Sequence, residues 1–331
     1  MHVVQAAIDG PRDYMISVIV CTYNRGTVLK AMLGSLAQMT VPSEIFWELI
    51  VVDNNSADQT RTVVENFAKS SALKVRYVFE RNQGLSHARN RGVQEAKGEI
   101  IVFTDDDVSI DPQWLVGIKR SFAEFNCIGV AGKVLPVWLQ ERPAWLELEG
   151  PYAIKAPPIT RLDLGEEPCK IATAPFGGNM AYRMEAFVKY GLFRTDLGVV
   201  GEKHHYGEDT EFGDRLIRSG EVIMYEPRAV IYHPIQAERM SKRYLVSSAL
   251  RGARDIVRGE GWPEYAICYF GIPRYMIRNF CKHLIKWIGC LNRNRRFYHK
   301  LAFWRAAGSL VGVYDYRMSK KNGRASPSGA C

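Results

Sequence analysis

Strands and helices alternate four times near the start of this chain, and that alternation restricts it to few folds. Four near-continuous apolar runs predict strands, at residues 15–20, 47–52, 75–79 and 100–103. Each is followed by a segment with apolar residues at helical spacing, at about residues 27–38, 58–67, 87–96 and 114–125. Apolar runs are typical of parallel strands covered on both faces, and the alternation is typical of α/β folds. We therefore predict an open, mostly parallel α/β sheet.

Polar clusters follow three of these strands, at residues 22–25, 53–56 and 105–107. In open α/β sheets, ligands bind beyond the carboxyl ends of the strands. Three separate loops are therefore expected to meet at one crevice, and their convergence predicts a binding site.

The cluster after the fourth strand is the acidic triplet Asp105-Asp106-Asp107. Carboxylates this close repel one another and are not buried without a partner. Oxygen ligands suit Mg²⁺ or Mn²⁺, and Mg²⁺ held in this way usually also binds substrate phosphates. The first hypothesis is a metal–diphosphate site, and the alternative is a solvated acidic turn leading into Asp111-Pro112.

The later part of the chain has weaker patterns. Residues 136–170 lack clear periodicity and are interpreted as a long surface excursion that could cover the site. A Gly-Gly turn at 177–178 leads into a strand, and a helix over 208–219 begins with acids, which the helix dipole favours. Two short strands are expected at 222–225 and 229–232, with His233 ending the second.

Charge is unevenly distributed along the 331 residues. From residue 240 onward there are 18 Lys and Arg and 4 Asp and Glu, a net charge of +14, whereas the first 239 residues carry −5. The two parts are expected to meet different partners.

Seven scattered cysteines without a close C-x-x-C pair indicate a reducing compartment, and Met1–Asp13 shows no secretory signal.

Several short motifs, in order and at suitable spacing, resemble glycosyltransferase family 2. They are Thr22-Tyr23-Asn24-Arg25, Val52-Asp53-Asn54-Asn55-Ser56, the segment 82–90, the acidic triplet as a DxD motif, Gly177-Gly178-Asn179 and Glu208-Asp209. The resemblance covers about residues 15–235. It implies the GT-A fold, a Rossmann-like nucleotide-diphospho-sugar transferase sheet, and sugar transfer with inversion.

The resemblance also implies residues for the nucleotide. Thr22, Tyr23 and Arg25 would line the base pocket, Asp53 would accept a hydrogen bond from the base, and Arg89 would lie near the base or the phosphates. Structural roles stay open: Tyr23 in the core, Asp53 in a turn or cap, and Arg89 in an ion pair on its helix.

A second set of residues would carry the chemistry. Asp105 or Asp106 would hold the ribose, Asp107 would bind the metal ion, and His233 would complete the metal sphere, although a lone His ending a strand is often structural. Asp209 would be the base that deprotonates the acceptor, with an alternative in Glu208 or Glu211. The acceptor and donor-sugar side would include Gly178, Asn179 and Glu208.

The basic C-terminal part has no counterpart in the resemblance. Arg274, Arg278, Lys282 and Lys286 recur every four residues and would form one stripe on a helix. Apolar and aromatic residues beside the stripe predict a helix lying on an anionic membrane surface. The alternative is a helix packed on the catalytic domain with its charges in water. Nucleic acid is not an expected partner, because no recognised module is present.

The predicted organisation is a catalytic domain over 15–235, with a nucleotide half (15–110) and an acceptor half (111–235). A basic amphipathic helical extension follows over 240–318, and a disordered tail over 319–331. No membrane-spanning helix is expected. The predicted function is metal-dependent, Mg²⁺ or Mn²⁺, inverting sugar transfer from a nucleotide-sugar donor to a saccharide or lipid-linked acceptor. The expected location is the cytoplasmic face of the cell membrane. Alternatives are a nucleotidyltransferase and a non-catalytic membrane- or polysaccharide-associated scaffold.

Overall fold

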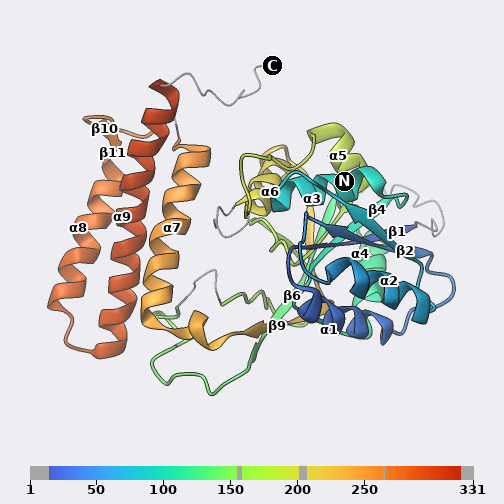
Figure 1. Ribbon diagram of the computed structural model, residues 1–331. Helices are drawn as coiled ribbons and strands as arrows, with labels where there is room; N and C mark the ends of the chain where they lie inside the picture. Colours follow the sequence, from blue (N-terminus) through green and yellow to red (C-terminus); the bar gives the residue numbers. More distant parts are fainter. Residues whose placement is uncertain (1–14, 155–158, 201–206, 264, 322–331) are drawn as a thin grey trace, which may run out of the picture. The chain divides into compact units, whose positions relative to one another are not determined.

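The apolar runs form neighbouring strands of one mixed sheet (Figure 1). The computed structural model describes residues 15–154, 159–200, 207–263 and 265–321. The strands of the sheet are β1 (Ile16–Thr22), β2 (Trp47–Asp53), β3 (Val75–Phe79), β4 (Ile100–Asp105), β5 (Ser109–Ile110), β6 (Gly129–Trp138), β7 (Cys169–Ile171), β8 (Asn179–Arg183) and β9 (Ile223–Ile235). Within the described residues their order is β3-β2-β1-β4-β8-β6-β9-β5, and β7 pairs with β9.

Parallel pairing joins β3, β2, β1 and β4, whereas β8 pairs antiparallel with both β4 and β6. In register, Thr22 lies opposite Asp53, and Cys21 lies opposite Asp105. The carboxyl ends of β1, β2 and β4 therefore meet at one edge, as the open α/β interpretation predicts.

Helices cover both faces of the sheet. They are α1 (Gly26–Ala37), α2 (Thr60–Ser70), α3 (Leu85–Glu95), α4 (Trp114–Glu124), α5 (Met184–Tyr190) and α6 (Glu208–Arg218). Alternate residues of β4 enter different cores: Ile100 and Val102 pack with α1, α2 and α4, and Ile101 and Phe103 pack with α3, α5 and α6. Burial on both faces explains why the strands lack polar alternation.

Two local predictions were wrong. The strands expected at 222–225 and 229–232 are one strand, β9. β9 continues through the residues where a break was expected. The buried Glu226 stabilises this part of the strand, because its carboxylate accepts hydrogen bonds from Ser121 Oγ (2.8 Å) and the Arg228 amide (3.0 Å). Thr27, whose hydroxyl would be a suitable cap for the helix expected from residue 27, lies inside α1, and Asp58 Oδ2 instead accepts from the Gly26 amide at the helix start (2.9 Å).

The chain divides into two compact units. The sheet unit includes the described residues 15–135, 161–200 and 208–233. The helical unit includes the described residues 136–154, 159–160, 207, 234–263 and 265–321. Residues 136–170 were interpreted as a surface excursion, yet Leu146, Ile154 and Ile159 of this segment are buried in the core of the helical unit.

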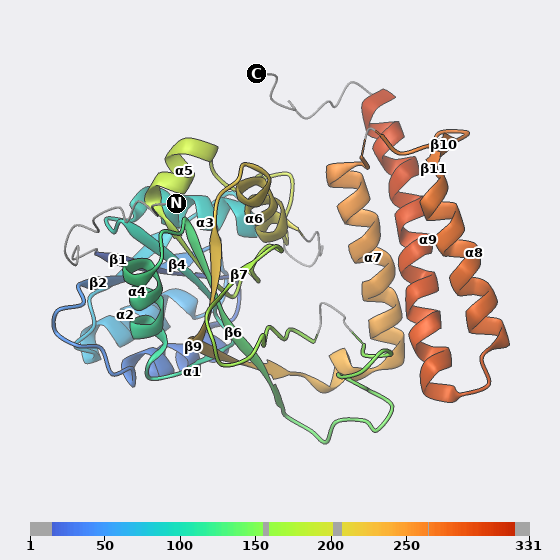
Figure 2. The same ribbon diagram turned by 180° about the vertical axis from the view of Figure 1, so that it is seen from behind.

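The helical unit contains three long helices, with α9 between α7 and α8 in both views (Figures 1 and 2). Its elements are η1 (Ala237–Met240), α7 (Lys242–Glu260), β10 (Cys268–Tyr269), β11 (Ile272–Pro273), α8 (Arg274–Gly289) and α9 (Arg293–Lys321). None of the described helices is long and apolar enough to cross a membrane. Residues 319–321 of the expected disordered tail belong to α9. Its remainder, 322–331, and the segment Met1–Asp13 lie outside the described residues.

Candidate active site

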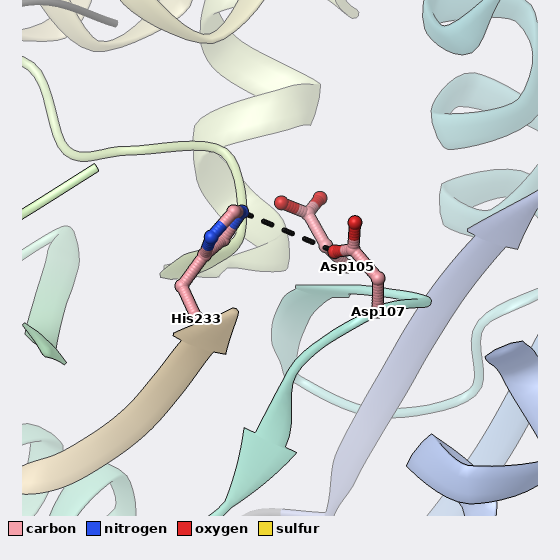
Figure 3. Close-up of side chains that lie close together, drawn as sticks. All are labelled: Asp105, Asp107 and His233. Carbon is pink, nitrogen blue, oxygen red and sulfur yellow. Dashed lines mark ion pairs between the residues drawn. The ribbon is translucent and has the colours of Figure 1, made fainter. Parts of the chain in front are cut away.

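Two carboxylates and an imidazole meet beyond the end of β4 (Figure 3). Asp105 is the last residue of β4, Asp107 lies in the following turn, and His233 comes from β9. One ligand atom from each lies within 4.8 Å of the others, and His233 Nε2 is 4.0 Å from Asp107 Oδ1. Carboxylate oxygens and imidazole nitrogen are donors that suit Mn²⁺ or Mg²⁺. Burial and the charge of Asp107 raise the pKa of Asp105. A bound cation would offset the repulsion between the two carboxylates. This donor set therefore fits a divalent ion.

Asp106 faces a different set of partners. Its carboxylate accepts hydrogen bonds from Thr22 Oγ1 (2.8 Å) and Arg25 Nη1 (2.6 Å). Burial raises the pKa of Asp106 to about 7, although Arg25 acts to lower it. Arg25 Nη2 also lies 2.7 Å from Asp107 Oδ2. Arg25, predicted to line the base pocket, thus bridges two carboxylates of the triplet.

The carboxylate of Asp53 is buried beyond the end of β2. Asp53 Oδ1 accepts from the Ser56 amide (2.9 Å), and Oδ2 accepts from the Tyr77 hydroxyl (2.7 Å). An ionised carboxylate has about four acceptor positions, so these two bonds leave capacity for a ligand. Tyr23 is half-buried in the loop after β1, next to Thr22.

Arg89 on α3 and Glu208 at the start of α6 form a buried ion pair, with Nη1 and Oε1 2.5 Å apart. Burial and the nearby charge of Asp209 raise the pKa of Glu208 to about 7, and Arg89 partly offsets this. Arg89 was expected near the base or the phosphates, and this pair places it beside the acids of α6.

Gly177 and Gly178 lie against the catalytic candidates. The Gly177 amide donates to Asp209 Oδ2 (2.8 Å). A Cβ on Gly177 would lie 2.9 Å from that oxygen and 2.3 Å from Arg89 Nη2, and one on Gly178 would lie 2.4 Å from Asp105 Oδ2. Only glycine allows these approaches. Because consecutive Cα atoms are about 3.8 Å apart, the carboxylates of Asp105 and Asp209 contact one short segment and belong to one site.

The side chain of Asn179, another site candidate, forms its hydrogen bonds with residues of α4, β6 and β9. Its Oδ1 accepts from Trp114 Nε1 (2.8 Å), and its Nδ2 donates to the carbonyls of Lys133 (2.9 Å) and Ala229 (2.8 Å). These bonds connect α4, β6 and β9 beneath the Gly-Gly turn.

Comparison with known families identifies the family of this chain. The model of glycosyl transferase family 2 matches residues 17–191, which include all but the first residue of β1, the strands β2 to β4, the acidic triplet and the Gly-Gly turn. The chain belongs to glycosyltransferase family 2. It is a glycosyltransferase, and the resemblance of its short motifs is confirmed.

Two curated relatives match most of this glycosyltransferase. Glucosyl-dolichyl phosphate glucuronosyltransferase of Haloferax volcanii is 25% identical over 236 residues, covering 70% of this chain and 72% of the relative. Succinoglycan biosynthesis protein ExoM of Rhizobium meliloti is 28% identical over 240 residues, covering 72% and 73%.

Solved structures confirm the GT-A fold. Mannosyltransferase PcManGT from Pyrobaculum calidifontis, in complex with GDP-Man and Mn²⁺, superposes with a TM-score of 0.53 at 18% identity, covering 99% of this chain and 79% of that one. GalNAc-T7 with UDP, GalNAc and Mn²⁺ gives a TM-score of 0.57 at 16% identity, covering 93% and 57%.

The proximity of Asp105 to Asp107 could be predicted from the sequence, whereas the contact of Tyr77 with Asp53 could not. Either Asp105 or Asp106 was expected to hold the ribose, and the structure groups Asp105 with Asp107 and His233. Asp105 and Asp107 are only two positions apart in the sequence, so their proximity was open to prediction. The bond from Tyr77 to Asp53 has no such signal, because it depends on the register of β2 with β3.

Proposed function

We propose that this glycosyltransferase moves a sugar from a nucleotide-diphosphate donor to a hydroxyl acceptor with inversion of the anomeric centre. The observation that carries this proposal is the approach of Asp105 and Asp209 to Gly178 and Gly177. It brings a cation-binding group and a candidate base to one short segment.

In this proposal Asp105, Asp107 and His233 hold Mg²⁺ or Mn²⁺. A divalent ion at this position would neutralise the charge that builds on the diphosphate leaving group. The chain supplies two oxygen donors and one nitrogen donor. The Mn²⁺ bound to PcManGT and GalNAc-T7 supports the choice of metal.

Asp209 is the proposed base. Its Oδ2 accepts from the Gly177 amide and its Oδ1 from the Thr210 amide (2.8 Å), so the carboxylate is oriented before the acceptor arrives. A carboxylate within hydrogen-bond reach of an acceptor hydroxyl typically contributes about 10²–10⁴-fold to the rate. Glu208 is the weaker candidate, because the Arg89 guanidinium already engages it.

The donor nucleotide is assigned to the loops after β1 and β2. Thr22, Tyr23 and Asp53 form the base and ribose side, together with Asp106, and Gly178 approaches the donor sugar. Arg25 is assigned to the border between nucleotide and metal, because it contacts both Asp106 and Asp107. Asn179 supports this site through the sheet.

The acceptor is proposed to be a lipid-linked or growing saccharide in polysaccharide or glycolipid synthesis. The names of the two curated relatives support this class, since one acts on a glucosyl-dolichyl phosphate and the other belongs to succinoglycan biosynthesis. We assign the protein to the cytoplasmic side of a membrane, because its six described cysteines are free and its C-terminal part is basic.

The test is a panel of UDP-, GDP- and dTDP-sugars with Mg²⁺ or Mn²⁺, in which release of nucleoside diphosphate is measured. Asp107→Asn is expected to lose Mn²⁺ binding and turnover. Asp209→Asn should retain donor binding and lose about 10²-fold or more in turnover. Glu65→Gln, which removes an exposed carboxylate on α2, should behave as wild type. Consumption of nucleoside triphosphates by a protein that ignores every sugar nucleotide would contradict the proposal.

A further inference from the structure

The helical unit contains a long segment without acids. Residues 265–314 include nine Lys and Arg and no Asp or Glu. This segment comprises the β10–β11 hairpin, α8 and most of α9. Surfaces of soluble proteins usually mix both signs of charge, so fifty residues with cations alone favour an anionic partner.

The outward face of α8 combines cations with exposed apolar side chains. Arg278, Lys282 and Lys286 are exposed, and beside them Ile285 and Ile288 are 70% and 69% exposed. The opposite face packs on α9. It includes Phe280 and Trp287, whose rings contact Phe303 at a tilt, with ring centroids 4.8 Å and 5.2 Å away. The exposed isoleucines therefore do not lie on the face of α8 that packs against α9.

A second apolar group projects from the hairpin that precedes α8. Phe270 at its tip is 100% exposed, and Ile267 and Tyr269 are also exposed. Phe270 has a φ of 51°, and Gly271 follows with a φ of 76°. A bulky side chain in the left-handed region is strained, and this one gains no packing in return. Such an outlier, combined with full exposure, indicates that the side chain meets an apolar environment outside the chain.

The hairpin has a defined position in the helical unit. Arg317 of α9 donates from Nη1 to the Phe270 carbonyl (3.1 Å), and the Arg274 amide donates to the Ile267 carbonyl (2.8 Å). At the other end of α8, Leu291 is 97% exposed. A helix of 16 residues is about 24 Å long, so two apolar groups flank a row of cations.

We propose that the β10–β11 hairpin inserts into an anionic lipid bilayer while the outward face of α8 lies on its headgroups. This inference deepens the membrane partner of the proposed function and rests on that assignment. In water, the cations attract the protein to the anionic headgroups. The exposed Phe, Tyr and Ile side chains then enter the boundary between the headgroups and the acyl chains. Nucleic acid would satisfy the cations but would leave Phe270 and Ile288 in water.

The test uses the full chain and sedimentation with vesicles of phosphatidylcholine alone, or of phosphatidylcholine and phosphatidylglycerol in equal parts. Wild type should bind the anionic vesicles in a salt-sensitive manner and the neutral vesicles weakly. Tyr269→Ser with Phe270→Ser should weaken partitioning roughly tenfold or more and keep the salt dependence. Lys282→Gln with Lys286→Gln should weaken binding to anionic vesicles roughly 30-fold and reduce the salt dependence.

Matched controls lie in the sheet unit. Val188→Ser removes a side chain that is 80% exposed on α5, and Lys30→Gln with Lys69→Gln removes two exposed cations. These variants should bind vesicles as wild type does. Equal binding by the hairpin variant and wild type would overturn the insertion. A concentration-dependent dimer lost in the hairpin variant, or preference for duplex DNA over anionic vesicles, would overturn the lipid assignment. Mn²⁺ titration of each variant separates this result from the proposed catalysis, because the sheet unit should bind Mn²⁺ whether or not vesicle binding fails.

Discussion

Arg25 Nη2 lies 2.7 Å from Asp107 Oδ2, so the carboxylate expected to bind a metal ion is already paired with a cation of the chain. The Arg25 side chain is 35% exposed, and its other terminal nitrogen engages Asp106. An ion arriving at this site must therefore share Asp107 with Arg25 or displace it. Arg25 would return to Asp107 when the ion and the nucleotide leave.

The first prediction concerns this competition. Arg25→Gln removes a positive charge next to the cation site, and Mn²⁺ should bind the nucleotide-free protein about fivefold more tightly, as expected for a partly exposed pair. Isothermal titration with Mn²⁺ measures this directly. Arg25→Lys, which keeps the charge, is the control and should stay near wild type. Weaker Mn²⁺ binding by the Gln variant would show that Arg25 builds the site.

The Gly-Gly turn gives the second prediction. Gly178→Ala should displace Asp105 and weaken Mn²⁺ binding roughly tenfold. Gly177→Ala should displace Asp209 or Arg89, so turnover falls while Mn²⁺ binding is retained. Either change should also cost about 1–3 kcal/mol of stability through overpacking.

Gly34 on α1 provides the matched control, because a Cβ at this position would meet nothing within 4 Å. Gly34→Ala should leave Mn²⁺ binding and turnover unchanged and stabilise the fold by up to about 1 kcal/mol. If Gly177→Ala were as active as Gly34→Ala, the carboxylate of Asp209 would not depend on this close approach.

The buried pair of Arg89 and Glu208 gives a pH-dependent prediction. The pKa of Glu208 is raised from 4.5 to about 7, so the folded state keeps a proton that the unfolded state loses. Stability contributed by this group is therefore present at low pH and falls as pH rises from about 4.5 through 7. Glu208→Gln should flatten this part of the curve of unfolding free energy against pH, measured by urea denaturation.

Arg89→Met should destabilise the sheet unit by about 3–5 kcal/mol above pH 7, because it leaves a buried carboxylate without its partner. The loss should shrink below pH 7, where Glu208 takes up a proton. A loss that is the same on both sides of pH 7 would show that Glu208 does not titrate in this range.

The sheet and the edge that carries the site could be predicted because they depend on local features. Apolar runs such as 100–103 predict buried strands without reference to any partner, and the parallel arrangement then brings Thr22, Asp53 and Asp105 to one edge. The family motif likewise marked His233, which lies near Asp107 although the two are far apart in sequence.

Features that depend on long-range packing could not be predicted. The role of Glu226, which bonds to Ser121 and lets β9 continue, depends on where α4 lies. The burial of Ile154 in the helical unit also has no periodic signal, because this segment contributes isolated side chains to a core built by α7 and α9. Sequence periodicity describes one element at a time, whereas these contacts join several.

The last prediction concerns two histidines of the helical unit. The ring centroids of His283 on α8 and His299 on α9 lie 5.9 Å apart. Burial lowers the pKa of both from 6.5; for His283 the charge of His299 adds to this, and Lys282 and Lys286 act on both in the same direction. The unfolded chain therefore binds protons more readily than the folded one, and the stability of the helical unit should fall as pH drops below about 6.5. His283→Phe with His299→Phe keeps the ring packing and removes the titration, so its melting temperature should vary less with pH than that of wild type. Scanning calorimetry at several pH values measures this, and parallel curves for the two proteins would mean that other groups cause the acid sensitivity.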